Sequence, residues 1–154
     1  MLEWLDLLLK TFCFSDIINH GFNHSHLEID DNWEVCYGDG RFDSEKFPDP
    51  ARMVASLNDL GFRTSLWIHP FINVECESYS EAAYPPNMFL IRDPKSKTVT
   101  HNGTFGEDGM FGDWEGTAWL PGTTLWWQGF SAGCVDFTNE EAARWWTDRL
   151  DTLR

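Results

Sequence analysis

The sequence predicts an α/β fold in which helices alternate with short buried strands. A strand-like run in "HSHLEI" is followed by a helix-like run in "FPDPARMVASLNDLGF" and by a second strand-like run in "RTSLWIHPF". Strand, helix and strand in this order imply a parallel pair with a right-handed crossover. Nearer the C-terminus, "AGCVDF" and "TNEEAARWWTDRLDTL" repeat the order of strand and helix. These observations together favour a layered or barrel-like α/β architecture.

The start of the chain predicts an amphipathic helix that runs to about Asn19, with Gly21 just beyond it as a C-cap. Four leucines recur at helical spacing on one face: Leu2, Leu5, Leu8 and Leu9. The stretch has no basic beginning and carries acidic residues among the leucines. It is therefore typical neither of a signal peptide nor of a membrane span.

The two later helices are bounded by recognisable capping signals. Apolar residues at helical spacing run from Met53 to Leu60, with a proline near the start and Gly61 as the stop. The last helix has Thr138 or Asn139 as its N-cap, followed by two glutamates where the helix dipole favours negative charge.

Between these regular parts, residues 72–129 form a long stretch rich in glycine, proline and aromatic residues, with weak periodicity. We interpret it as a glycine-rich loop, and a loop of this length in a compact domain is usually functional or disordered. The length of 154 residues fits one domain, 1–154.

The composition excludes some classes of partner. With 25 acidic and 11 basic residues the formal net charge is −14, which repels phosphate backbones, so a nucleic-acid partner is not expected. Nine tryptophans and twelve phenylalanines exceed the needs of a core of this size, and some of these rings are expected to line a cleft.

Metal binding is also disfavoured by the spacing of the candidate ligands. The four cysteines are far apart, with no C-x-x-C pair, and are interpreted as buried thiols, with one disulfide left open as the alternative. His24 and His26 precede the apolar run of the first strand and would lie at the bottom of that strand, opposite the usual active face, so no metal site is assigned.

Polar side chains follow each predicted strand. Asp30 and Asp31 follow the first, His69 follows the second, and Asp136 ends the third. In a (β/α)₈ barrel the reactive groups lie at the carboxyl ends of the strands. Because such a barrel needs about 250 residues, the sequence predicts a partial (β/α)₈ TIM barrel with the long loop inserted.

Two segments carry a family resemblance. "LEIDDNWEVCYGDGRFDSEKFPDPARMVASLNDLGFRTSLWIHPFIN" and "WWQGFSAGCVDFTNEEAARWW" resemble parts of the catalytic barrel of glycoside hydrolase family 31. The resemblance implies an α-glycosidase, α-glucosidase- or α-galactosidase-like, that hydrolyses O-glycosyl bonds of carbohydrates with retention and without a cofactor. The segment from Ala82 to Leu125 is longer and richer in glycine than the family's usual link.

The resemblance also implies which residues bind substrate. Asp30 occupies the place of the family's aspartate that accepts hydrogen bonds from sugar hydroxyls. Trp127 resembles the tryptophan that forms an apolar wall beside the sugar, and Trp67 aligns with another position lining the pocket. Asp31 and Trp33 are candidates for the same rim.

No catalytic residue is assigned within the chain. A retaining mechanism uses two carboxylates, and the family places its nucleophile on the strand after the "DFTN" helix and its acid/base further on, both beyond Arg154. The resemblance therefore implies a fragment, the N-terminal portion of the barrel, that holds part of the sugar pocket and is inactive alone. A non-catalytic carbohydrate-binding or regulatory relic is the alternative. Oligomeric state and compartment stay open, with a secretory or membrane-anchored luminal location expected if a signal or anchor precedes Met1.

Some residues favour a structural interpretation. Asp136 begins "DFTN", which lies directly before a helix and is a good helix-capping sequence. Trp145 and Trp146 lie mid-helix and are interpreted as packing residues. Asn102 begins the sequon N-G-T, an acceptor for glycosylation only in a secreted or luminal chain.

Overall fold

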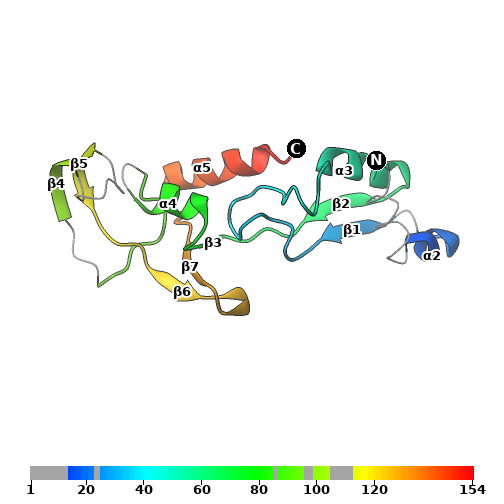
Figure 1. Ribbon diagram of the computed structural model, residues 1–154, viewed down its shortest axis with the longest axis horizontal. Coiled ribbons are helices and arrows are strands. Elements are labelled where there is room, and N and C mark those ends of the chain that lie inside the picture. The colour runs from blue at the N-terminus through cyan, green and yellow to red at the C-terminus, as the bar shows by residue number, and fades with distance from the viewer. Residues whose placement is uncertain (1–13, 23–24, 85–86, 96–98, 105–112) are drawn as a thin grey trace. The chain divides into compact units, whose positions relative to one another are not determined.

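The protein is seen in a computed structural model that describes residues 14–22, 25–84, 87–95, 99–104 and 113–154 (Figure 1). The chain divides into two compact units. Unit 1 consists of Met1–Trp33 and Phe42–Ile68, and unit 2 of Glu34–Arg41 and His69–Arg154. The segment 34–41 thus leaves unit 1 directly after Trp33 and returns to it eight residues later.

Unit 1 is built on a parallel strand pair. β1 (His26–Ile29) pairs with β2 (Arg63–Leu66), with His26 opposite Arg63 and Ile29 opposite Leu66. The helix α3 (Pro50–Asp59) connects them and lies beside β2 in Figure 1. This confirms the strand–helix–strand unit and the parallel pairing expected from the sequence.

Local signals account for the boundaries of α3. The Asp49 side chain accepts a hydrogen bond from the Arg52 amide at 3.0 Å, which satisfies one of the free N–H groups of the first turn. Pro50 fits the first turn because its missing N–H is not needed there. At the other end Gly61 takes a φ of +91°, and the buried side chains of Met53 and Leu57 face the strands' core with Phe62.

Of the segment predicted as a helix up to about Asn19, the structure describes α2 (Phe14–Asn19), after which Gly21 has a φ of +80°. The four leucines of the predicted amphipathic face lie outside the described residues. No helix in the described part of the chain combines the length and apolar character needed to cross a membrane.

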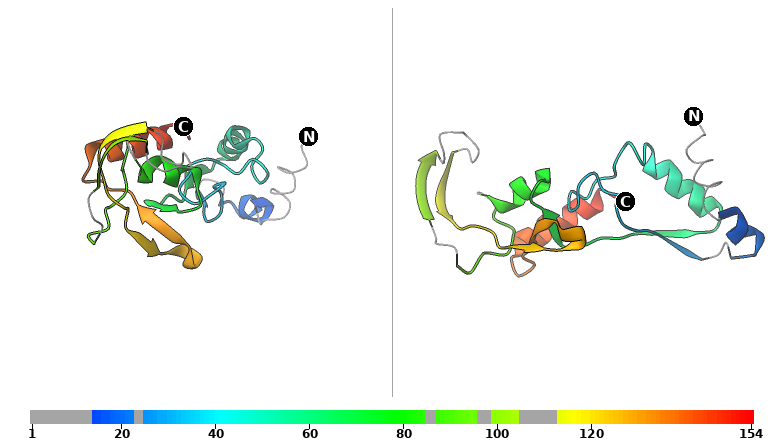
Figure 2. Two further views of the ribbon diagram at one scale, coloured as in Figure 1. Left: turned by 60° about the vertical axis from the view of Figure 1, so that its left-hand side comes forward. Right: turned by 60° about the horizontal axis from the view of Figure 1, so that its bottom comes forward.

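Unit 2 contains an antiparallel sheet in the order β3–β7–β6, made of β3 (Phe71–Asn73), β7 (Ser131–Cys134) and β6 (Thr123–Leu125). The helices α4 (Glu77–Ala83) and α5 (Glu140–Asp151) pack with this sheet around a shared core. The large buried side chains of that core include Ile72, Tyr79, Phe89, Leu90, Val135 and Trp146. β4 (Val99–Thr104) and β5 (Asp113–Ala118) form a separate antiparallel pair, visible as a ribbon in Figure 2.

Two expectations from the sequence are wrong here. Residues 72–129 are not one loop, because they include most of β3 and all of α4, β4, β5, β6 and the 3₁₀ turn η1 (Trp127–Gly129). The strand that includes Cys134 does not extend the parallel pair, because β7 runs antiparallel between β3 and β6. Strands of three or four residues are too short to show a period, and their partners lie about 60 residues away for β3 and β7.

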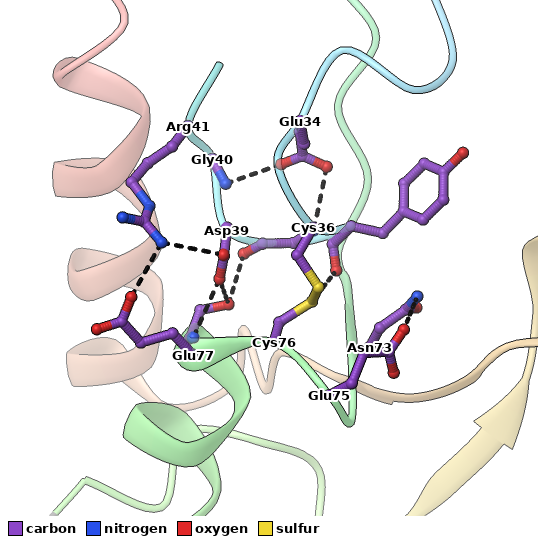
Figure 3. The surroundings of a disulfide bond; sticks show 12 residues. Glu34, Cys36, Asp39, Gly40, Arg41, Asn73, Glu75, Cys76 and Glu77 are labelled. Atoms are coloured by element: carbon purple, nitrogen blue, oxygen red, sulfur yellow. Dashed lines mark hydrogen bonds and ion pairs between the residues drawn. A yellow bond between two sulfur atoms is a disulfide. The ribbon is translucent and has the colours of Figure 1, made fainter. Parts of the chain in front are cut away.

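The interpretation of all cysteines as buried thiols is also wrong, and the alternative of one disulfide holds. Cys36 and Cys76 are joined by a disulfide with a Cα–Cα distance of 5.7 Å (Figure 3). Cys134 is free and half-buried. Cys13 lies outside the described residues. The bond attaches the segment 34–41 to the N-cap residue of α4.

Polar contacts reinforce this attachment. The buried carboxylate of Asp39 accepts hydrogen bonds from the Ser78 amide at 3.1 Å and the Ser78 hydroxyl at 2.6 Å. Arg41 donates to both Asp39 and Glu77, as Figure 3 shows, and Asp39 in particular raises the pKa of the Arg41 guanidinium. The segment is therefore held on α4 by the disulfide, by the ion pair of Arg41 with Glu77 and by the hydrogen bonds from Ser78 to Asp39.

Candidate functional site

The carboxyl ends of β1 and β2 lie side by side in unit 1. The Trp67 amide, directly after β2, donates a 2.9 Å hydrogen bond to the carbonyl of Ile29, the last residue of β1. Asp30 follows at once and is exposed, and its Oδ1 accepts from the Asp31 amide at 2.7 Å. A carboxylate and an aromatic residue therefore leave adjacent strand ends. The sequence predicts this placement for Asp30 and Asp31, whereas Trp67, expected within the second strand, directly follows it.

Trp33 is buried in unit 1 and contacts the backbone of Trp67, just after β2. Its side chain is 1% exposed, and its Nε1–H donates to the Trp67 carbonyl at 2.7 Å. The indole also packs against Phe42 with ring centroids 4.8 Å apart. A buried indole needs such an acceptor for its N–H. The bond ties the segment after β1 to the segment after β2, so Trp33 is suited to orient Trp67.

A lysine that the sequence analysis did not single out holds the turn after the acidic pair. Lys46 Nζ donates to the carbonyl and side-chain oxygens of Asn32 at 3.1 and 2.9 Å, and forms an ion pair with Asp43 at 3.2 Å. Asn32 has a φ of +65°, a conformation that asparagine tolerates better than most residues. The Glu45 amide and then Lys46 lower the pKa of Asp43, which keeps this carboxylate charged.

Trp127 belongs to unit 2, where it lies on the turn between β6 and β7. Its side chain is 45% exposed, so a large aromatic surface is open on that turn. Trp126, directly before it, is half-buried and stacks on Phe71 of β3. The structure thus gives two adjacent tryptophans different surroundings, with Trp126 against Phe71 and Trp127 exposed.

A buried acid–imidazole pair lies in unit 2. The Glu34 carboxylate accepts hydrogen bonds from the amides of Gly38 at 3.0 Å and Gly40 at 2.8 Å, and its Oε2 lies 3.1 Å from His69 Nε2. Both side chains are less than a tenth exposed. Sequence reasoning placed His69 after the second strand but missed Glu34, because its partners come from positions 4 to 35 residues further along.

Asp136 has the geometry of a turn and cap residue. Its Oδ1 accepts hydrogen bonds from the Thr138 amide at 3.0 Å and the Thr138 hydroxyl at 2.6 Å. Asn139 is the N-cap of α5 and accepts from the Glu141 amide at 2.9 Å. Within the described residues no group of three or more His, Cys, Asp or Glu side chains is arranged to hold a metal ion.

Comparison with known proteins assigns the family. The model of the glycosyl hydrolases family 31 TIM-barrel domain matches residues 15–153. The chain belongs to glycosyl hydrolase family 31.

Relatives of this family 31 chain are much longer than the chain itself. It is 37% identical over 138 residues to the myogenesis-regulating glycosidase of Mus musculus, which covers 90% of the chain and 16% of the relative. It is 25% identical over 140 residues to the alpha-xylosidase XylQ of Lactiplantibacillus pentosus, covering 86% of the chain and 15% of the relative. The chain thus spans less than a fifth of the length of these relatives.

Solved structures of the family share the fold. The family 31 alpha-xylosidase from a soil metagenome, solved with xylose, superimposes with a TM-score of 0.65 over 96% of this chain and 18% of that one, at 17% identity. At such low identity the likeness concerns the fold of the chain and not its substrate.

Proposed function

We propose that this chain contributes part of the sugar-binding face of a family 31 barrel that hydrolyses α-glycosidic bonds with retention of configuration. In this proposal the chain is the N-terminal portion of a partial (β/α)₈ barrel, and the nucleophile and acid/base come from the rest of the protein. Asp30 accepts hydrogen bonds from sugar hydroxyls, Trp67 and Trp127 contact the sugar's apolar faces, and Asp31 and Trp33 complete or support the rim.

The observation that carries the proposal is the pairing of strand ends in unit 1. The hydrogen bond from the Trp67 amide to the Ile29 carbonyl brings Asp30 and Trp67 to the same edge of a parallel pair. In barrels of this class the loops at that edge build the active site. A sugar presents hydroxyls and apolar C–H faces, which suit an exposed carboxylate beside aromatic rings.

The substrate class follows from the same chemistry. A neutral glycoside does not depend on long-range electrostatic attraction, so the net charge of −14 does not oppose its binding. The similarity to an alpha-xylosidase makes α-xylosides the first substrates to test, followed by α-glucosides and α-galactosides.

The test uses the full-length protein that contains this chain and p-nitrophenyl α-xyloside, α-glucoside and α-galactoside as substrates. Asp30→Ala should lower kcat/KM about a hundredfold, because a sugar hydroxyl that loses a charged acceptor in a water-poor pocket loses roughly 2–3 kcal/mol. Circular dichroism should show that the variant is still folded, since Asp30 is exposed.

Asp136→Ala is the matched control. This change also removes an aspartate that follows a strand, but one whose contacts are made to the turn before α5. It should leave kcat/KM within about threefold and lower the melting temperature. The reverse pattern, with Asp136→Ala folded but inactive and Asp30→Ala near the unaltered enzyme, would place the pocket elsewhere.

The 154-residue chain alone should hydrolyse none of the three substrates. Retention needs two carboxylates about 5–5.5 Å apart, and in this proposal the rest of the protein supplies both. Turnover that persists through repurification of the chain would overturn this. Sugar binding without any hydrolysis by the full-length protein would instead favour the non-catalytic carbohydrate-binding alternative.

A further inference from the structure

The turn between β6 and β7 carries backbone strain. The Trp126 amide donates to the Phe130 carbonyl at 3.0 Å, and the Phe130 amide donates back to the Trp127 carbonyl at 3.3 Å. Between them Gln128 has a φ of +56°, a left-handed conformation that is unfavourable for a residue with a side chain. A strained turn keeps one conformation only where the surrounding structure holds it.

The contacts of the Trp126 side chain fix the conformation of this turn. Its ring stacks on Phe71 of β3 with centroids 4.9 Å apart and planes at 23°, and its centroid lies 4.4 Å from that of His69. Tyr37 meets it edge-on at 5.8 Å. The indole therefore reaches from the turn across the sheet and sits among rings of unit 2.

Asn73 accepts the polar end of this indole. Trp126 Nε1 donates to Asn73 Oδ1 at 2.7 Å, while Asn73 Nδ2 donates to Glu75 Oε1 at 3.0 Å (Figure 3 shows the Glu75 contact). Because the indole can only donate and the carboxylate can only accept, these two partners define the orientation of the amide.

The Asn73 backbone is as firmly placed as its side chain. The side chain is 1% exposed, the Asn73 amide donates to the Tyr37 carbonyl at 2.9 Å, and the residue pairs with Ala132 of β7. A rigid acceptor on β3 thus faces a donor on the turn.

We propose that Asn73 is a positioning residue for Trp127. Held by Glu75, it latches the Trp126 indole, fixes the β6–β7 turn and so sets the direction in which the exposed Trp127 ring meets a sugar. This inference rests on the proposed function, in which Trp127 contacts the substrate.

The test compares two tryptophan-to-phenylalanine variants of the full-length protein. Trp126→Phe keeps a ring for stacking and removes the N–H that Asn73 accepts. Trp145→Phe is the matched control, because it removes an indole N–H that donates at 2.8 Å to Glu81 on another face of unit 2. Hydrogen exchange of the Phe130 amide, which closes the turn, reports the order of the turn, and KM and kcat are measured with the best p-nitrophenyl α-glycoside.

Trp126→Phe should speed exchange of the Phe130 amide and raise KM about fivefold, the effect of one neutral hydrogen bond, with kcat within about twofold. Trp145→Phe should change neither quantity. Glu75→Gln keeps an acceptor for Asn73 and should behave like the unaltered protein, whereas Asn73→Ala should resemble Trp126→Phe.

If exchange of the Phe130 amide is unchanged in both Trp126→Phe and Asn73→Ala, the hydrogen bond between Asn73 and Trp126 does not fix the turn, whatever the kinetics. Faster exchange with unchanged KM, in a protein where Trp127→Ala does raise KM, would overturn the positioning role. If Trp127→Ala itself leaves KM unchanged while the Asp30→Ala effect persists, the positioning role fails although the proposed function stands.

Discussion

At the scale of single residues, two glycines in the segment 34–41 show how tightly this segment is packed. Gly38 has a φ of +104°, and a Cβ there would lie 2.6 Å from Ile72 Cα and 2.7 Å from the Phe71 carbonyl oxygen. Gly40 has a φ of +63°, but the nearest atom to a Cβ would be Arg149 Cβ at 4.0 Å. Both positions favour glycine by conformation, and only Gly38 also requires it for space.

Gly40→Ala should lower the free energy of unfolding by about 1–2 kcal/mol, the cost of a left-handed conformation for alanine. Gly38→Ala should lower it by about 1–3 kcal/mol more, because a methyl group forced against the β3 backbone must displace it. Urea denaturation followed by circular dichroism measures both values. Equal effects would mean that segment 34–41 does not pack on β3 as closely as described.

At the scale of elements, the Cys36–Cys76 disulfide is the covalent link between the segment 34–41 and α4. It closes a loop with a sequence separation of 40, for which the loss of unfolded-chain entropy corresponds to about 4 kcal/mol. The contacts of Asp39 with Ser78 remain when the bond is absent, so the segment keeps part of its attachment.

The double variant Cys36→Ser/Cys76→Ser should therefore be folded but less stable by up to about 4 kcal/mol in urea denaturation. Cys134→Ser is the control and should cost far less. Burial, with a smaller effect of Asp136, raises the pKa of the Cys134 thiol, so this thiol should alkylate slowly in the native protein.

Alkylation under denaturing conditions, with and without prior reduction, checks the pairing itself. Peptides containing Cys36 and Cys76 should be labelled only after reduction. Labelling of both without reductant, in protein recovered from its native source, would show that the bond does not form there. A stable disulfide is typical of oxidising compartments, so this measurement also bears on the location that the sequence left open.

At the scale of the whole molecule, the chain exposes apolar surface that a longer family 31 protein would have the means to cover. Among the described strands, β1 and β2 pair only with each other, so each has one unpaired edge. Several large apolar side chains are also at least half exposed, among them Phe22, Leu120, Leu125 and Phe137.

The isolated chain should therefore self-associate, because free strand edges and apolar side chains both favour pairing with another copy. Association should increase with added salt, since the net charge of −14 repels like chains and salt screens that repulsion. Sedimentation velocity over a range of protein and salt concentrations measures it. A monomer with a sharp, reversible unfolding transition would contradict this prediction and favour a stand-alone binding module.

The sequence by itself determined the elements whose signals are local. The β1–α3–β2 unit and α5 follow from apolar periodicity and from caps such as Asp49 and Asn139, and these contacts span only a few residues. The placement of Asp30 beside the carboxyl end of the second strand follows as well, because a parallel crossover brings the carboxyl ends of its strands together.

Only the tertiary structure decided the rest. Three features depend on partners 34 to 53 residues away. They are the pairing of Cys36 with Cys76, the burial of Trp33 against the Trp67 carbonyl, and the inward packing of Trp126 next to the exposed Trp127. Two of the short strands within 72–129, β3 and β6, likewise exist because both pair with β7. Local propensity carries no information about such distant partners, so packing between separate segments determines which ring packs inward and which remains exposed.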